Sequence, residues 1–457
     1  MKRLLQKVAD KVVIPDADAI RGNIALLSEI DGIRIRWESS NPGCISDRYI
    51  DKKAPGVVTR GETDCQVTLK AILEYQGETL EKEISVTVLA APEMLRDEDY
   101  KGYLFGHFIG EDNEMGEQIY FAVSEDGLHF QDISPSKPLL ISTVGEKGVR
   151  DPYLYRSPEG DRYFLIATDL SIYHRGGWFL NEQGYYDAST TGSSNLVLWE
   201  SNDLVHWGEP RLLPVAPKNA GMAWAPEMIY HQETGEYVVF FASSIMNPDT
   251  KYKAKPNAIY YTTTRDFIHF GETKLFIDCQ TDKAEDGKPR EIIDTTVLKV
   301  GDTYYSASKD GDNAEKNGGI RIMKTKNLLD YTSWEKVLDL DELGLDTSAT
   351  AGRPLDNGLL EGPELFRFNQ RDWADKNVPE YGLIADQYAI GAGYLPLTTT
   401  NLEDKDNSNG SWRILPAGEY SFDKLKKRHG TIMPITEQEM QRLTEFAKNA
   451  QKFERNK

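Results

Sequence analysis

The sequence has few cysteines and no long hydrophobic run. Only three cysteines, Cys44, Cys65 and Cys279, occur in 457 residues, and none belongs to a Cys-x-x-Cys pair. An odd number at these spacings argues against a disulfide framework and against a zinc site, although it leaves open a single Cys44–Cys65 bridge. No apolar run reaches the length of a transmembrane helix, so no membrane-spanning segment is expected.

Positive charge is also scarce. The chain has 53 Lys and Arg against 73 Asp and Glu, which gives a formal net charge of −20. Nucleic acids and anionic membranes require a basic face, so neither is expected as a partner, whereas a neutral ligand such as a sugar is compatible. The first residues include Lys7, Asp10 and Lys11 and lack the apolar stretch of a signal peptide. This favours a cytoplasmic location, unless a leader has been removed.

The composition, with 39% hydrophobic and 28% charged residues, is that of an ordinary globular protein, and the length favours two or three domains. Residues 1–92 form a first unit. Apolar and polar residues alternate in 33–37, 66–71 and 83–88, which is typical of strands with one face in water. We therefore predict a small β-sandwich without a cluster of residues suited to chemistry.

A different pattern recurs from about residue 98. An apolar strand is followed by Ser/Thr-x-Asp/Asn and then by an aromatic residue, with a spacing of roughly 60 to 75 residues that fits four strands and long loops. Clear copies begin at Ser124, Ser201 and Thr264, with weaker ones at Thr325 and Thr400. Such turns hold themselves by hydrogen bonds. The histidines inside them are therefore predicted to be structural; they are His129, His206 and His269.

Five short segments resemble one another even more closely, each with a polar or small start and an apolar continuation. They are 150–155, 224–229, 293–298, 361–366 and 428–433. The first four are each followed by a second strand. The last has none, but strands 103–108 and 118–123 are left over at the start, and pairing with them would remove its open edge.

The chain is therefore predicted to be all-β, with a small β-sandwich followed over residues 98–457 by a five-bladed β-propeller. A short C-terminal helix is expected after the last strand. Thr436 and Glu439 match a capping box at its start, and Met440, Leu443 and Phe446 share one face.

The starts of these segments carry the candidate chemistry. Asp151, Asp294 and His429 occupy the aligned position, and Glu361 stands one residue earlier. Inner strands of a propeller converge on one axis, so these residues would meet. Glycoside hydrolysis needs an acid and a base, and neighbouring aspartates raise the pKa of a glutamic acid. A two-carboxylate hydrolase is the leading hypothesis. The alternative is a non-catalytic carbohydrate-binding propeller. Such a protein would gain nothing from buried carboxylates, because removing them from water costs free energy.

Two resemblances to known families support this prediction. Residues 14–23, 37–42 and 56–60 resemble the immunoglobulin-like modules attached to bacterial carbohydrate-active enzymes. About residues 98–436 resemble glycoside hydrolase family 43, whose members are five-bladed propellers that release pentose units. That resemblance rests on five motifs in order: Arg150-Asp151-Pro152, Trp224-Ala225-Pro226, Ile293-Asp294, Glu361-Gly362-Pro363 and Arg428-His429-Gly430.

The family-43 resemblance implies catalytic roles. Asp151 would be the general base, Glu361 the general acid, and Asp294 would raise the pKa of that acid and hold it in place. Family members invert the anomeric centre, which requires the two carboxyls to lie about 6.5–9.5 Å apart. One departure is Glu227, which follows Trp-Ala-Pro where an aspartate or another residue often stands.

The resemblance also implies how ligands are held. Trp224 would form the floor of the sugar site, and Arg353 is a further expected substrate-binding residue. His429 would face a central cation, commonly calcium, which is held mostly through water and is not required for chemistry, although calcium prefers oxygen ligands. The expected substrate is an oligo- or polysaccharide that loses terminal α-L-arabinofuranosyl units, with β-1,4-xylose as the alternative. The aromatic insertion 172–195 is expected to wall the site and favour exo-action.

Overall fold

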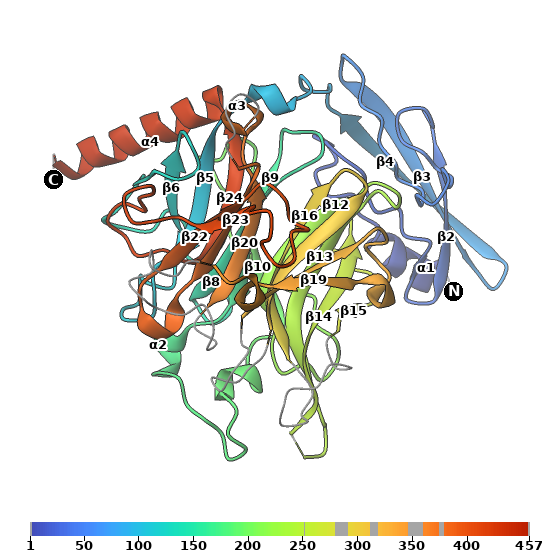
Figure 1. Ribbon diagram of the computed structural model, residues 1–457. Coiled ribbons are helices and arrows are strands. Elements are labelled where there is room, and N and C mark those ends of the chain that lie inside the picture. The colour runs from blue at the N-terminus through green and yellow to red at the C-terminus, as the bar shows by residue number, and fades with distance from the viewer. Residues whose placement is uncertain are drawn as a thin grey trace.

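The computed structural model describes residues 2–250, 252–278, 291–310, 319–345, 360–373 and 379–455. Its regular structure is dominated by six four-stranded antiparallel sheets, so the all-β prediction is confirmed (Figure 1). Cys44 and Cys65 are both free thiols, and Cys279 lies outside the described residues. No helix in the described parts of the chain is long and apolar enough to cross a membrane.

The N-terminal unit has one regular sheet. Its strands are β1 (Glu29–Ile30), β2 (Ile33–Ser39), β3 (Cys65–Tyr75) and β4 (Glu78–Val88), which confirms the three predicted strands. A second regular sheet of the expected sandwich is not present among the described residues; isolated bridges join further segments, and α1 (Lys2–Ala9), which the sequence pattern did not indicate, contacts β3 and β4. The helix forms because Leu5, Val8 and Ala9 lie on one face and are buried against the sheet.

Five further sheets follow, and we call them blades I to V. In sheet order, blade I consists of β8 (Val149–Arg156), β9 (Tyr163–Asp169), β10 (Asn195–Ser201) and β11 (Arg211–Pro214), and blade II of β12 (Trp224–His231), β13 (Glu236–Met246), β14 (Lys253–Thr264) and β15 (Lys274–Ile277). Blade III consists of β16 (Ile292–Val300), β17 (Thr303–Asp310), β18 (Ile320–Thr325) and β19 (Glu335–Asp339), and blade IV of β20 (Glu361–Arg367), β21 (Tyr381–Asp386), β22 (Tyr394–Thr399) and β23 (Trp412–Ile414). Blade V consists of β24 (Arg428–Thr436), β5 (Tyr100–Phe108), β6 (Tyr120–Ser124) and β7 (Phe130–Asp132).

The first strands of these blades form a closed ring. β8 contacts β12, β12 contacts β16, β16 contacts β20, β20 contacts β24, and β24 contacts β8. In blade V the last strand of the chain, β24, pairs with β5, the first strand after the N-terminal unit, with Ile432 opposite Phe105. The predicted closure, in which the C-terminal strand joins the strands before Asp151, is therefore confirmed. It leaves no open edge between the two ends of the ring.

Short helices and a longer one connect and finish the blades. The short ones are α2 (Ile172–Arg175), α3 (Gln370–Trp373) and the 3₁₀ turns Asp97–Asp99, Asp187–Ser189, Tyr331–Ser333, Leu340–Leu343 and Tyr388–Ile390. The C-terminal helix α4 (Glu437–Arg455) follows β24. Its capping box is confirmed: the Thr436 N–H donates to Glu439 Oε2 at 2.6 Å, and the Glu439 N–H donates to Thr436 Oγ1 at 3.3 Å. Leu443 is fully buried.

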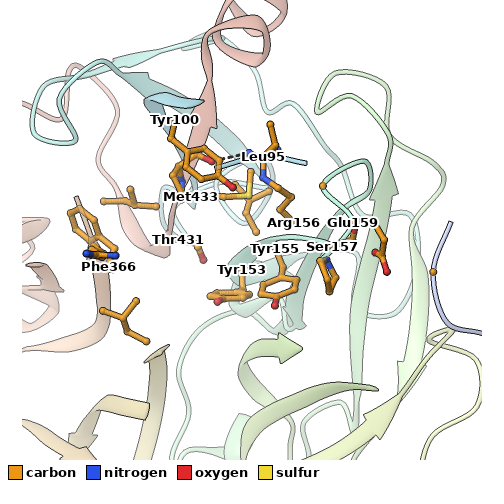
Figure 2. Close-up of a pocket in the computed structure, with 18 of the residues that line it drawn as sticks. Leu95, Tyr100, Tyr153, Tyr155, Arg156, Ser157, Glu159, Phe366, Thr431 and Met433 are labelled. Carbon is orange, nitrogen blue, oxygen red and sulfur yellow. Dashed lines mark hydrogen bonds between the residues drawn. The ribbon is translucent and has the colours of Figure 1, made fainter. Parts of the chain in front are cut away.

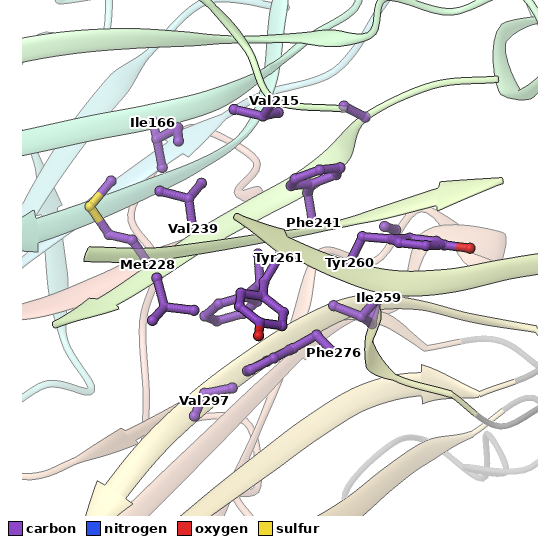
Figure 3. Packing of buried hydrophobic residues seen from close by; sticks show 14 of the residues in the cluster. Ile166, Val215, Met228, Val239, Phe241, Ile259, Tyr260, Tyr261, Phe276 and Val297 are labelled. Carbon is purple, nitrogen blue, oxygen red and sulfur yellow. The ribbon is translucent and has the colours of Figure 1, made fainter. Parts of the chain in front are cut away.

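The core lies between neighbouring blades. In the largest cluster, Phe241 and Ile259 of blade II pack with Phe276, and Val297 of blade III reaches the same cluster (Figure 3). Phe276 also meets Trp334 edge to face at 5.6 Å between ring centroids. Because each blade covers an apolar face of the next, the ring holds the first strands at fixed positions around its axis.

The repeated turns hold their own histidines. In blade I, Asp203 accepts from the backbone N–H of His206 at 2.7 Å, and its other oxygen lies 2.7 Å from Nδ1 of the same imidazole. His129 and His269 repeat this arrangement with Asp126 and Asp266 at 2.8 and 2.7 Å. These contacts support the prediction that the three histidines are structural.

Candidate active site

A common backbone distortion begins the first strand of each blade. A β-bulge interrupts all five strand pairs at this point. In four of them one residue adopts a left-handed conformation: Asp151 (φ 50°), Ala225 (46°), Asp294 (49°) and Gly362 (51°). A bulge turns a side chain away from the regular alternation of the strand. The position equivalent to Asp151 in blade IV is therefore Gly362, and Glu361 precedes it.

The glycine at this position is required by its neighbour. A Cβ atom on Gly362 would lie 2.6 Å from Cγ of His429, much closer than carbon atoms approach. Only glycine therefore allows the imidazole of blade V to pack against the bulge of blade IV. The close packing places His429 beside the residues that begin blades I, III and IV.

His429 lies between the two aspartates. Its Nδ1 is 3.2 Å from Asp151 Oδ1 and 4.0 Å from Asp294 Oδ2. Burial would lower the pKa of this imidazole, but the charge and hydrogen bond of Asp151, with Asp294 and Glu361, outweigh it and raise the pKa to about 9. The imidazole is therefore a cation near neutral pH.

Asp151 is held as a carboxylate. Burial would raise its pKa, but the charge and hydrogen bond of His429, followed by Arg150 and Thr168, lower the pKa below its ordinary value. Thr168 donates to Asp151 Oδ2 at 2.7 Å and accepts from the backbone N–H of Ala225 at 2.7 Å. Both carboxylate oxygens are thus oriented, one by His429 and one by Thr168, as a general base requires.

Asp294 has a higher pKa than Asp151. Burial raises its pKa to about 6; Glu361 and Asp151 add to this rise, whereas His429 and Lys309 oppose it. Asp294 Oδ2 accepts the backbone N–H of Gly362 at 3.1 Å. The bond ties the carboxyl of blade III to the residue that follows Glu361.

Glu361 is held by two cations. Lys309 Nζ is 3.2 Å from its Oε2 and Arg428 Nη2 is 3.1 Å from its Oε1. Arg428 also pairs with Asp386 and, at 3.6 Å, with Glu111, so three carboxylates share its charge. The Glu361 side chain remains 20% exposed and can meet a ligand.

A wall of aromatic residues stands next to this group. Trp178, from the insertion between β9 and β10, donates from Nε1 to Glu111 Oε1 at 3.2 Å. Its ring meets Trp224 almost at right angles, with 6.3 Å between centroids. Glu111 is paired in turn with Arg150 at 3.3 Å. The two tryptophans form a corner beside the carboxylates.

Two further glutamates lie deeper along the ring axis. Burial, with Glu364 nearby, raises the pKa of Glu227 well above its ordinary value, and burial raises that of Glu364 to about 8. Glu364 Oε1 accepts the Ile432 N–H at 3.1 Å, and Glu227 Oε2 accepts the Val297 N–H at 3.3 Å. Burial therefore favours the neutral form of both carboxyls.

The structure brings together most of the residues expected from the sequence. Asp151, Asp294, Glu361 and His429 form one connected group, with Trp224 near its edge. Arg353 lies outside the described residues. The sequence did not assign roles to Lys309, Arg428, Glu111 or Thr168. Arg428 stands next to His429 in its motif and could have been suspected, but no pattern marked Lys309.

The described residues of this group do not form a set of direct calcium ligands. Nδ1 of His429 faces Asp151, and within the described residues no three His, Cys, Asp or Glu side chains are arranged to hold a metal ion. A single imidazole is a poor calcium ligand. The central cation stays a prediction, and no chemical step below depends on it.

The fold and the group of acids define the class of the protein as a glycoside hydrolase. Residues 98–441 match the family-43-related model described as "Probable glycosyl hydrolase domain", and the chain belongs to this family. Residues 7–91 match the model described as "Atrophied bacterial Ig domain", which agrees with the single regular sheet of the N-terminal unit. Both resemblances seen in the sequence are thereby confirmed.

A curated relative is an α-L-arabinofuranosidase of Bifidobacterium longum subsp. longum. It is 29% identical over 401 residues, an alignment that covers 79% of this chain and 35% of the relative. The chain thus spans about a third of the length of that protein.

Solved structures also resemble the chain. A thermostable family-43 glycoside hydrolase aligns with 10% identity and a TM-score of 0.43, covering 79% of this chain and 93% of that one. An α-L-arabinofuranosidase from Lactobacillus brevis aligns with 16% identity and a TM-score of 0.37 over 65% and 92%. An exo-β-1,3-galactanase from Clostridium thermocellum aligns with 16% identity and a TM-score of 0.37 over 60% and 51%.

Proposed function

We propose that the ring is a five-bladed β-propeller that removes terminal α-L-arabinofuranosyl units from hemicellulose or pectin side chains. The observation that carries this proposal is the connection of Asp151, Asp294 and Glu361, from three blades, through His429 and Gly362. The sequence similarity to an α-L-arabinofuranosidase favours arabinose over xylose.

In the proposed reaction Asp151 takes a proton from water while the oxygen of that water attacks the anomeric carbon. Glu361 gives its proton to the glycosidic oxygen as the bond to the anomeric carbon breaks. The configuration inverts, and each carboxyl returns to its starting state by proton exchange with solvent. Thr168 and His429 orient Asp151, while Asp294 and the shared Arg428 orient Glu361.

The aromatic corner supports exo-action in this proposal. Trp224 offers a face for the sugar ring, and Trp178 closes one side of the site. A wall beside the catalytic acids leaves room for a chain end and obstructs a continuous polymer.

The first test replaces the two proposed catalytic carboxylates. Asp151→Asn and Glu361→Gln should each lower kcat on arabinan side-chain oligosaccharides by about 10³-fold, because each loses a proton-transfer group. Glu361→Gln should lose much less on an aryl α-L-arabinofuranoside with a good leaving group, which needs no protonation. Proton NMR of the first-formed anomer should show inversion.

Exposed carboxylates provide matched controls for these variants. Asp302→Asn and Glu125→Gln should keep full activity and the same melting temperature, since both positions are exposed. Normal turnover of an unactivated oligosaccharide by Glu361→Gln would show that Glu361 is not the acid. If an aryl β-D-xyloside is cleaved faster than the arabinofuranoside, the proposed substrate is wrong and the enzyme is a β-xylosidase.

A further inference from the structure

Figure 2 shows residues that line a cavity of about 580 Å³. The cavity lies farther along the first strands of the ring than the candidate catalytic residues. The catalytic candidates occupy the first positions of β8, β16, β20 and β24. The cavity is lined by later positions of the same strands and their continuation, in the ranges 153–160, 296–298, 364–367 and 431–434. Residues of the N-terminal unit and of the connecting segment, which includes Met94 and Leu95, complete it.

Flat aromatic faces make up one side of the cavity. Tyr153 and Tyr155 point to the same side of β8 (Figure 2). Their rings stack with 6.3 Å between centroids and 22° between planes. Tyr100 and Phe366 also line the space. A saccharide ring presents C–H groups on its faces and hydroxyls at its rim, so it suits flat rings flanked by polar groups.

The arginines of the lining are already paired with carboxylates. Arg21 and Arg60 both lie 2.8 Å from Asp161. Arg156 pairs with Glu439, and Arg367 lies 2.7 Å from Glu380. Because each of these arginines has a carboxylate partner, the lining does not favour an anionic ligand.

Two buried polar atoms of the lining have no partner within the described residues. They are Ser157 Oγ, on a residue that is 3% exposed, and Glu159 Oε2. Leaving such atoms unpaired costs about 1–3 kcal/mol each, so a small shift of either side chain towards a ligand in the cavity would be favourable. Both accept hydrogen bonds, and the hydroxyls of a sugar donate them.

We propose that this cavity is a second, non-catalytic site that binds a neutral mono- or disaccharide between the N-terminal unit and the ring. The sugar ring lies on Tyr153 and Tyr155, and its hydroxyls bond to Ser157 and Glu159. The volume falls within the usual range of about 300–1,000 Å³ for small-molecule sites. Met94, which is 83% exposed, marks the entrance. This site does not depend on the roles assigned to Asp151 and Glu361.

Calorimetric titration of the full chain with arabinobiose, xylobiose and β-1,3-galactobiose tests the site. All proteins carry Glu361→Gln, so that substrate is not consumed. Leu95→Trp fills the cavity from the connecting segment, outside any strand, and Ile141→Trp adds the same ring at an exposed position elsewhere. For at least one sugar, Leu95→Trp should bind one molecule fewer than Ile141→Trp. That difference is expected whether or not the catalytic site binds the sugar.

Ser157→Ala provides a second, smaller change. Because it removes an unpaired buried hydroxyl, the melting temperature should stay the same or rise. The affinity of the cavity for the sugar should fall about tenfold, because one contact to the sugar is lost. In otherwise unchanged enzyme, neither Leu95→Trp nor Ser157→Ala should alter kcat/KM for an aryl glycoside. Equal stoichiometry and affinity in all variants for all three sugars, or tighter binding of galacturonic acid than of the neutral sugars, would overturn the proposal.

Discussion

The imidazole of His429 sets the charge of the residues around it. It is a cation between Asp151 and Asp294, and it keeps the first ionised while the second has a pKa of about 6. Two aspartates at equivalent strand positions thus have different pKa values, because the imidazole holds a hydrogen bond to Asp151, while burial, with Glu361 nearby, raises the pKa of Asp294.

Replacing His429 by asparagine should change the pH dependence of activity. Burial tends to raise the pKa of Asp151, and His429 is the main group that lowers it. Without the cation the pKa of Asp151 rises. Because a general base acts in its ionised form, the acidic limb of the kcat/KM profile should move to higher pH, by about one unit.

The check is a kcat/KM profile measured from acidic to neutral pH. His206→Asn is the matched control, since that imidazole is 85% exposed and pairs only with Asp203 of its own turn. An unchanged acidic limb in His429→Asn would mean that Asp151 is not the base, or that His429 does not control it.

The site residues were predictable from the sequence where they stand at equivalent positions of a repeated strand. Asp151, Asp294 and His429 share one position in a repeated strand, and a repeat places equivalent positions around one axis. Lys309 and Arg428 were not assigned roles, because their importance comes from Glu361 on another strand. Ion pairs between blades leave no regular spacing in the sequence.

At the scale of elements, the insertion between β9 and β10 is anchored to the site at its start. Glu117 is fully buried and accepts the backbone N–H groups of Ile172 and Tyr173 at 2.8 and 3.0 Å. The same carboxylate pairs with Arg150 at 3.0 Å, next to Asp151. The base of the insertion and the start of β8 are therefore held by one group.

Trp178 should contribute to substrate binding through this insertion. Trp178→Ala removes the edge contact with Trp224 and the hydrogen bond to Glu111. KM for an arabino-oligosaccharide should rise about tenfold while kcat changes little, since the role proposed for the ring is substrate binding and not proton transfer.

The neighbouring Phe179→Ala is the control for Trp178→Ala. Phe179 is 58% exposed and comes from the same insertion, so its loss should leave KM unchanged. Equal effects of the two variants would indicate a general disturbance of the insertion, and no effect of Trp178→Ala would remove the tryptophan from the site.

The strands were predictable from their patterns, but the bulges were not. Ala225 adopts the same left-handed conformation as Asp151 and Asp294, although alanine has no preference for it. The ring forces the distortion on each first strand where neighbouring blades approach the axis. An apolar pattern predicts a strand and carries no signal for this distortion.

For the whole molecule, the contact between the N-terminal unit and the ring includes a group of ion pairs around Asp161. Its carboxylate accepts two hydrogen bonds from Arg60, at 2.8 and 3.1 Å, and one from Arg21 at 2.8 Å. The Arg60 side chain is only 6% exposed. The N-terminal unit appears beside the ring in Figure 1.

Asp161→Ala should weaken this contact strongly. It leaves the buried Arg60 without its carboxylate, which costs about 3 kcal/mol in comparable buried pairs. Urea unfolding should show this loss, or the N-terminal unit should unfold before the ring.

Lys52→Ala is the control for Asp161→Ala at the same contact. Lys52 pairs with Glu233 at 2.5 Å, but both side chains are more than half exposed, so its loss should change stability by less than about 1 kcal/mol. Similar unfolding of Asp161→Ala and wild type would show that the Arg60 pair does not hold the two parts together.

The sequence by itself determined the strands, the order of the blades, the closure by the last strand and the capped helix, because alternation, repetition and capping are local patterns. Only the tertiary structure decided which charges face one another. It placed Lys309 and Arg428 on Glu361, set His429 against Gly362, and formed a cavity beneath the N-terminal unit. These features depend on distances between strands far apart in the chain, and such distances exist only once the ring has closed.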